Sequence, residues 1–136
     1  MATLPVYDPQ KAILVSEPPT GPRWVHELKL DGYRMGVFIR REGRARAVCI
    51  ISRNGNEYTT AYPEVVASAL SLPCETATLD GEIVILSESG LSDFHALQSL
   101  GESRGGLTYF AFDLLAVNGE NLTAMAMEDR KRVGYF

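Results

Sequence analysis

Four pairs of Asp or Asn followed by Gly divide this chain into short apolar runs. Asn, Asp and Gly tolerate the positive backbone φ of tight turns, so such pairs favour β-hairpins. The runs between the pairs are rich in Val, Ile, Phe and Tyr, which favour strands. The pairs are Asp31-Gly32, Asn54-Gly55, Asp80-Gly81 and Asn118-Gly119. The pattern predicts turns at all four pairs and a largely antiparallel sheet.

The apolar runs and two helix-start signals predict the order of the elements. Strands are expected at residues 24–30, 33–40, 46–52, 76–86 and 107–117. Helices are expected at 62–70 and 94–100, and the charged stretch 125–136 could start a third. Pro63 stands at the start of the first helix, and Ser92 or Asp93 can cap the second. Meandering strands with inserted helices predict an α+β domain.

The first 22 residues contain five prolines. Proline fixes φ and has no backbone N–H to donate, so this stretch is poorly suited to a helix or a central strand. We therefore expect an irregular entry arm over residues 1–22, followed by one folded domain over residues 23–136.

Composition limits the partners of the chain. No apolar run approaches the roughly 20 residues that a membrane-spanning helix needs, and the N-terminus lacks the pattern of a secretory signal. We therefore expect a cytoplasmic protein without a membrane partner. The net charge of -4 repels a polyanion, so any contact with nucleic acid must be local. The basic cluster Arg40, Arg41, Arg44 and Arg46 is either a solvated hairpin tip or a phosphate-contacting patch.

A lysine between two carboxylates is the first candidate for chemistry. In a strand over 24–30, Glu27 and Lys29 would share one face, which Asp31 would continue. Lysine attacks only as the neutral amine, which carboxylates disfavour, so a nucleophilic role needs a cation such as Mg²⁺ or Arg34 nearby. Without that cation, the same residues describe an exposed hairpin with alternating charges. The residues alone leave both interpretations open.

Four short motifs along the chain carry a resemblance to one family. The sequence Lys-Leu-Asp-Gly-Tyr-Arg at 29–34 resembles the Lys-x-Asp-Gly-x-Arg nucleotidyl-transfer motif of ATP-dependent DNA ligases. Ser-Arg-Asn-Gly at 52–55, Asp-Gly-Glu at 80–82 and Phe-Asp-Leu-Leu at 112–115 resemble the family's second, acidic and aromatic motifs, in the family's order. RNA ligases and capping enzymes share the lysine motif, but the second and aromatic motifs favour a DNA ligase.

The resemblance implies a role for each matching residue, with ATP and Mg²⁺ as cofactors. Lys29 would form a lysyl-AMP bond, and Asp31 and Gly32 would support it. Glu27 would help to recognise adenine, Arg34 and Arg53 would hold ribose or phosphate oxygens, Glu82 would bind Mg²⁺ or ribose hydroxyls, and Phe112 would stack on adenine. Each role suits the chemistry of its side chain.

Three of these residues also have a purely structural explanation. Glu82 could be the polar face of a half-buried strand that alternates with Ile83 and Ile85. Phe112 could belong to the core, and Arg53 could be a charge beside a turn. Taken one residue at a time, the sequence does not decide between these explanations and the implied roles.

The resemblance also implies an incomplete domain. Segments 17–19 and 118–120 resemble the bacterial end-joining ligases, so the similarity covers almost the whole chain. Complete members continue with a Glu-Gly motif, a Lys-x-Lys motif and an oligonucleotide-binding barrel, to which nothing here is assigned. We therefore expect a truncated nucleotidyltransferase domain with an exposed sheet edge, which acts on nicked or broken DNA and could need a second chain that supplies the missing motifs. The alternative is a catalytically inactive relative that binds nucleotide, DNA or a partner chain.

Overall fold

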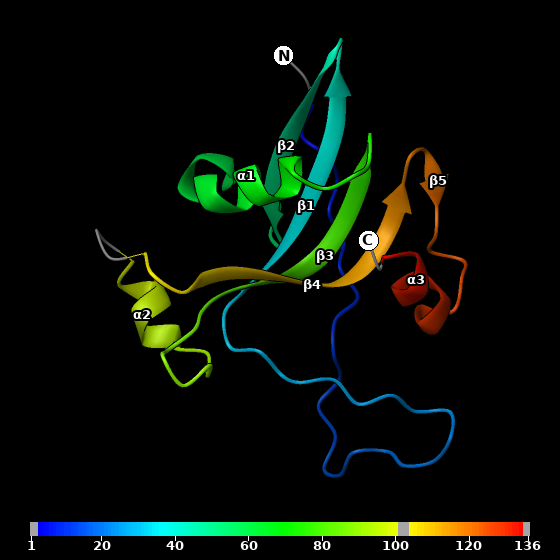
Figure 1. The fold of residues 1–136 in the computed structure, drawn as a ribbon. Helices are drawn as coiled ribbons and strands as arrows, with labels where there is room; N and C mark the ends of the chain where they lie inside the picture. The colour runs from blue at the N-terminus through cyan, green and yellow to red at the C-terminus, as the bar shows by residue number, and fades with distance from the viewer. Residues whose placement is uncertain (1–2, 101–103, 135–136) are drawn as a thin grey trace.

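The computed structural model describes residues 3–100 and 104–134. These residues form a five-stranded antiparallel sheet in the order β2-β1-β3-β4-β5, together with three α-helices (Figure 1). The strands are β1 Tyr33–Glu42, β2 Ala45–Ser52, β3 Ala77–Ile85, β4 Leu107–Val117 and β5 Glu120–Asn121. The helices are α1 Pro63–Leu70, α2 Phe94–Gln98 and α3 Met127–Val133. The α+β class expected from the sequence is confirmed.

The two faces of the sheet carry different cores. Alternate residues of β1 and β3 bury the main core on one face, where they pack with Val65 of α1 and Leu97 of α2. A smaller core on the other face consists of Tyr7, Phe38, Cys49 and Ile51. Residues 3–22 contain no helix or strand, as their prolines predict. Because Tyr7 belongs to the second core, the irregular arm is nevertheless docked on the sheet, on the face opposite α1 (Figure 1).

The helix signals of the sequence are confirmed. Pro63 is the first residue of α1. The Asp93 side chain caps α2 by accepting a 3.0 Å hydrogen bond from the Ala96 N–H, although α2 ends at Gln98 and not at residue 100. In the described part of the chain, none of the helices has the length and apolar character needed to cross a membrane.

The expected strand at 24–30 is wrong. This segment has no regular structure, and Figure 1 shows it within a long loop (blue to cyan) that extends away from the sheet. The Leu28 side chain is 91% exposed. Alternation of polar and apolar residues stabilises a strand only where a neighbouring strand pairs with its backbone and a core covers its apolar face. Neither condition is met for this segment among the described residues.

Two of the four Asp-Gly and Asn-Gly pairs form the expected turns. Asn54-Gly55 forms the turn after β2, and Asn118-Gly119 joins β4 to β5 with both residues at positive φ. Asp31-Gly32 is a bend before β1 and joins no hairpin. The turn predicted at Asp80-Gly81 is wrong, because this pair lies within β3. Glycine is required there since a side chain would collide with the Phe110 carbonyl oxygen of β4.

Strand β4 is irregular in its pairing with β3. The register passes from Gly81↔Ala111 to Asp80↔Asp113, so Phe112 is an extra residue opposite β3. A second register shift, from Leu79↔Leu114 to Thr78↔Ala116, leaves Leu115 as a second extra residue. Strand β5 pairs only with the last two residues of β4. The rest of the outer edge of β4 has no strand partner within the described residues, which agrees with the expected exposed edge.

Candidate nucleotide-binding site

Three predicted site residues meet on the sheet face opposite α1. Arg34 of β1 and Glu82 of β3 are register partners, and directly opposed side chains lie on the same face. Phe112 comes from the bulge of β4, and its ring centre lies 5.3 Å from the guanidinium carbon of Arg34. A cation at this distance is attracted by the π face of the ring. We call Arg34, Glu82 and Phe112 the sheet cluster.

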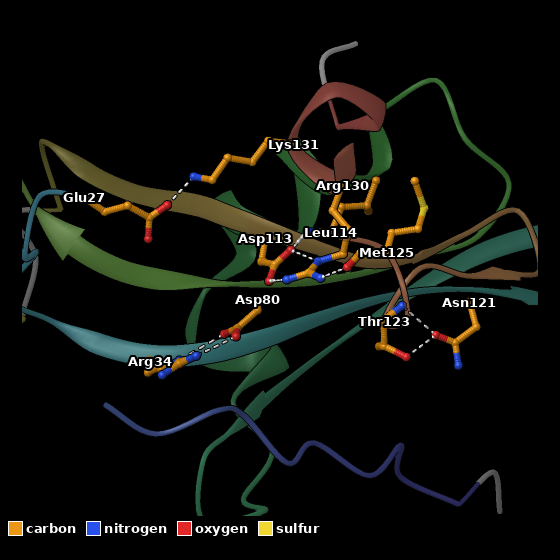
Figure 2. A network of polar contacts seen from close by, with 10 residues as sticks. All are labelled: Glu27, Arg34, Asp80, Asp113, Leu114, Asn121, Thr123, Met125, Arg130 and Lys131. Atoms are coloured by element: carbon orange, nitrogen blue, oxygen red, sulfur yellow. Dashed lines mark hydrogen bonds and ion pairs between the residues drawn. The ribbon is translucent and has the colours of Figure 1, made fainter. Parts of the chain in front are cut away.

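Arg34 is held by a buried carboxylate. Its Nε and Nη2 donate to the two oxygens of Asp80 at 3.1 and 2.7 Å (Figure 2), and Asp80 is only 4% exposed. This bidentate interaction fixes the plane of the guanidinium and raises the pKa of Arg34, so the group remains charged. The Tyr7 hydroxyl also donates to Asp80. The sequence does not reveal the roles of Asp80 and Tyr7, because the Asp80-Gly81 pair predicts a turn and the prolines around Tyr7 predict an irregular arm.

Glu82 is a half-buried carboxylate that accepts a hydrogen bond from the backbone. Burial raises the pKa of Glu82, whereas the hydrogen bond from the Gly32 N–H and the positive charges of Arg34 and Lys29 act in the opposite direction. The Gly32 N–H donates to Oε1 at 3.2 Å. No group of three or more His, Cys, Asp and Glu side chains that could hold a metal gathers within residues 3–100 and 104–134. A single carboxylate still suits Mg²⁺, which commonly binds one or two carboxylates together with substrate phosphates.

Gly32 fits closely against β3. A side chain at this position would collide with the Ile83 carbonyl oxygen and with the Val84 side chain. The residue before it, Asp31, donates its backbone N–H to the Ser92 hydroxyl at 3.3 Å. The absence of a side chain at Gly32 therefore lets β3 approach its backbone. Asp31 and Gly32 therefore anchor the end of the preceding irregular segment, residues 24–30, beside Glu82.

The exposed segment, residues 24–30, carries the predicted nucleophile. Lys29 is exposed, and its charge is close enough to lower the pKa of Glu82. Glu27 forms an ion pair with Lys131 of α3 (Figure 2), and both side chains are partly exposed. The exposed segment is thus attached to the fold at Gly32 and at Glu27.

Arg53 is not joined to the sheet cluster by any hydrogen bond or ion pair among the described residues. It is exposed and lies in the turn after β2, where the Gly55 N–H donates to the Ser52 carbonyl at 2.9 Å. Ser52 is the register partner of Met35, so Arg53 follows β2 at the end of the sheet where β1 begins. Its expected contact with the nucleotide stays a prediction.

A second Arg–Asp pair fastens α3 to β4. Arg130 donates to both oxygens of Asp113 at 2.8 and 2.9 Å and to the Met125 carbonyl at 2.6 Å (Figure 2). The Asp of the Phe-Asp-Leu-Leu motif therefore holds a helix. Beside this pair lies a pocket of about 280 Å³, lined by Leu79, Ala111, Phe112, Asp113, Leu114, Lys131 and Gly134.

Most of the basic cluster at the β1–β2 turn is occupied by the protein itself. Arg46 donates to the carbonyls of Leu72 and Cys74 at 2.9 and 2.6 Å, just beyond the end of α1. Arg41 pairs with Glu75, and Arg40 donates to the carbonyl of Thr3 at 3.2 Å. These contacts favour the hairpin tip over a phosphate-contacting patch.

Comparison with known protein families gives a match over most of the chain. The family model described as ATP dependent DNA ligase domain matches residues 11–133. The chain belongs to this family. The match includes the lysine motif, the sheet cluster and α3, so the resemblance that the four motifs predicted is confirmed.

Two curated relatives of this ligase-family chain are end-joining proteins. It is 40% identical over 125 residues to the multifunctional non-homologous end joining protein LigD of Pseudomonas aeruginosa, covering 90% of the chain and 14% of that relative. It is 37% identical over 139 residues to the bifunctional non-homologous end joining protein LigD of Bacillus subtilis, covering 88% of the chain and 22% of that relative. The chain therefore corresponds to less than a quarter of each of these proteins.

Solved ligase structures share the fold. The ligase domain of LigD from M. tuberculosis superposes with a TM-score of 0.69 at 34% identity. A mycobacterial DNA ligase D complexed with ATP and MES gives a TM-score of 0.68 at 36% identity. Each comparison covers 79% of this chain and 34% of the solved chain. The sheet and helices described above thus correspond to about a third of those solved chains.

Proposed function

We propose that this chain carries the lysine-adenylating part of an ATP-dependent DNA ligase that acts on nicked or broken DNA, with Lys29 as the nucleophile. The observation that carries the proposal is the sheet cluster, in which a charged arginine, a partly buried carboxylate and an aromatic ring meet beside the end of the segment that bears Lys29. These three groups suit phosphate or ribose oxygens, a divalent cation and a base, respectively.

The chemistry is transfer of AMP from ATP to an amine. The neutral Lys29 amine attacks the α-phosphorus, a P–N bond forms, and the bond between the α-phosphorus and the bridging oxygen breaks. Pyrophosphate leaves with that electron pair, and the amine releases a proton. Arg34 supports this step because a fixed cation stabilises negative charge that builds up on a transferring phosphoryl group. Arg53 would contact ribose or phosphate oxygens, and Glu27 would contact the adenine.

The nucleotide contacts follow from the free groups of the cluster. Arg34 has five N–H donors, of which Asp80 and the Gln10 carbonyl take three, so two remain for ribose or phosphate oxygens. Phe112 offers adenine the ring face that Arg34 does not cover. Glu82 would hold Mg²⁺ jointly with phosphate oxygens, and the cation would supply charge neutralisation for the leaving pyrophosphate.

Sealing DNA demands more than adenylation. AMP would pass from Lys29 to a DNA 5′-phosphate, and the DNA 3′-hydroxyl would then displace it. The net charge of -4 and the internal contacts of the basic cluster leave little surface for gripping a duplex. We expect these 136 residues to accept AMP slowly and to seal no nick unless the remaining ligase motifs are supplied, either by further sequence or by a second chain.

Intact-protein mass spectrometry after incubation with ATP and Mg²⁺ tests the proposal. The chain should gain the mass of one AMP, and Lys29→Ala should gain none. Lys11→Ala is the matched control, because Lys11 is another exposed lysine outside the cluster, and it should gain AMP like the unchanged chain. If neither the unchanged chain nor the control gains AMP, the alternative of a binding protein without turnover is favoured.

A further inference from the structure

The N-terminal arm reaches the site through Tyr7. Only 7% of Tyr7 is exposed, and its ring meets Phe38 edge-on with the ring centres 6.3 Å apart. The ring also lies over Gly36 of β1, where any side chain would collide with it. Gly36 therefore creates the space that Tyr7 fills, and the arm has a defined seat on the sheet.

The Tyr7 hydroxyl completes the surroundings of Asp80. One Asp80 oxygen accepts from both the Tyr7 hydroxyl and the Arg34 Nε, and the other accepts from the Arg34 Nη2. A buried carboxylate is costly unless its oxygens are hydrogen-bonded, so each of these donors helps to fix it. Burial and the Asp80 carboxylate both raise the pKa of Tyr7, which keeps its proton available for donation.

The arm also touches Arg34 directly. The Gln10 carbonyl accepts a 2.6 Å hydrogen bond from Nη1 of Arg34. The guanidinium is thus held by the arm on one edge and by Asp80 on another, while its carbon stays 5.3 Å from the centre of the Phe112 ring. A group held in this way loses less rotational freedom when it binds a ligand than a free arginine does.

We propose that Tyr7 is a positioning residue for the nucleotide site: by holding Asp80, it orients the Arg34 guanidinium over Phe112 and keeps its two remaining donors available to ATP. The inference rests on the proposed function only in that Arg34 contacts the nucleotide. It gives the arm a part in ATP binding that acts through Asp80 and Arg34.

Calorimetric titration with ATP and Mg²⁺ tests this role in the Lys29→Ala background, where no adduct forms and binding can be measured at equilibrium. Tyr7→Phe keeps the ring and removes only the hydroxyl. It should weaken ATP binding about tenfold, the effect of one hydrogen bond to a charged group. Phe38→Leu is the matched control: it disturbs the same small core without touching Asp80 and should leave ATP binding within about twofold while lowering thermal stability.

A double-mutant comparison separates positioning from general stability. If Tyr7 acts through Arg34, Tyr7→Phe should cause no further loss of ATP binding when Arg34→Ala is already present. Equal effects of Tyr7→Phe with and without Arg34, or equal losses for Tyr7→Phe and Phe38→Leu, would overturn the positioning role. Weakening by Arg34→Ala but not by Tyr7→Phe would overturn this inference alone. Binding that is unaffected by Arg34→Ala, or no ATP binding at all, would overturn the assignment of Arg34 as well, while the mass experiment tests Lys29 separately.

Discussion

The sheet cluster and the exposed segment contribute to one candidate site but are held in very different ways. Arg34 and Glu82 are opposed by strand register, and Arg34 has a buried partner in Asp80. Lys29 lies on a segment without regular structure, attached through Gly32 at one end and through the Glu27 ion pair. The groups that would orient a nucleotide are therefore rigid, whereas the group that would attack it has few contacts. Such a division would suit the proposed role of Lys29, which would first attack ATP and later release its AMP to DNA.

The largest effect should come from breaking the ion pair between Arg34 and Asp80 that supports the sheet cluster. Asp80→Asn keeps the shape of the side chain but leaves the Arg34 charge without its carboxylate and Tyr7 with a poorer acceptor. We expect a loss of about 3 kcal/mol in the free energy of unfolding, at the low end for a broken buried pair because Arg34 is partly exposed. Urea denaturation measures it. Asp113→Asn is the matched control; it should loosen only α3 and cost about 1–2 kcal/mol. Equal losses in the two variants would show that the Arg34–Asp80 pair stabilises the fold no more than the Arg130–Asp113 pair does.

A smaller effect should come from the junction between the two regions. Gly32→Ala places a methyl group against the Ile83 carbonyl, so the exposed segment must move away from β3. We expect a loss of about 1–3 kcal/mol in stability by urea denaturation, and a larger fractional loss in the rate of AMP addition by mass spectrometry. Gly105→Ala has open space around its new methyl group and should change neither measurement. An unchanged adenylation rate in Gly32→Ala would mean that this anchor does not position Lys29.

The pH dependence of stability should reveal the burial of Glu82. Its pKa is raised in the folded state, so the folded protein binds this proton more tightly than the unfolded chain does. The contribution of Glu82 is therefore most favourable in acid and is lost as the pH rises through the usual Glu range and through the raised pKa of Glu82. Glu82→Gln should gain stability relative to the unchanged chain across that rise. Denaturation curves collected from acidic to neutral pH measure the difference. A constant difference would mean that Glu82 titrates alike in the folded and unfolded states.

The smallest effect should come from the ion pair between Glu27 of the exposed segment and Lys131. Lys131→Met removes the charge that binds Glu27 while keeping a side chain of similar length. Both partners are partly exposed, so we expect a change of about 0–1 kcal/mol in stability, smaller still in high salt. Lys11→Met serves as the control for loss of one positive charge. A loss comparable with that of Asp80→Asn would show that the exposed segment is more firmly held than its contacts indicate.

Sequence patterns predicted the parts of this fold that depend on local composition. The apolar runs located β1 to β4, and Pro63 marked the start of α1. Ser92 and Asp93 were both candidates for the cap of α2, and the structure shows Asp93 in that place. The alternation of polar and apolar residues around Lys29 predicts a strand, because this pattern is the same whether or not a partner strand pairs with the segment. Pairing is a long-range property, and it cannot be read from the segment itself.

The candidate site was predicted only in part for a similar reason. The family motifs led to Arg34, Glu82 and Phe112, which the sheet brings together. They could not indicate that Asp80 would be buried under Arg34, or that a tyrosine 73 positions earlier would donate to it. Proline content correctly described the backbone of the arm as irregular, but irregular backbone can still be tightly docked.

The extra residues of β4 limit how this strand can vary during evolution. Tyr109, Leu114 and Val117 all pack into the main core, although a regular strand would turn residues an odd number of positions apart to opposite faces. Phe112 and Leu115 supply the shifts that reconcile these positions. Deleting either one would invert the remainder of the strand and expose core side chains to water. Related chains should therefore tolerate substitutions within 109–117 far better than changes in length, and insertions or deletions should accumulate in the loops on either side.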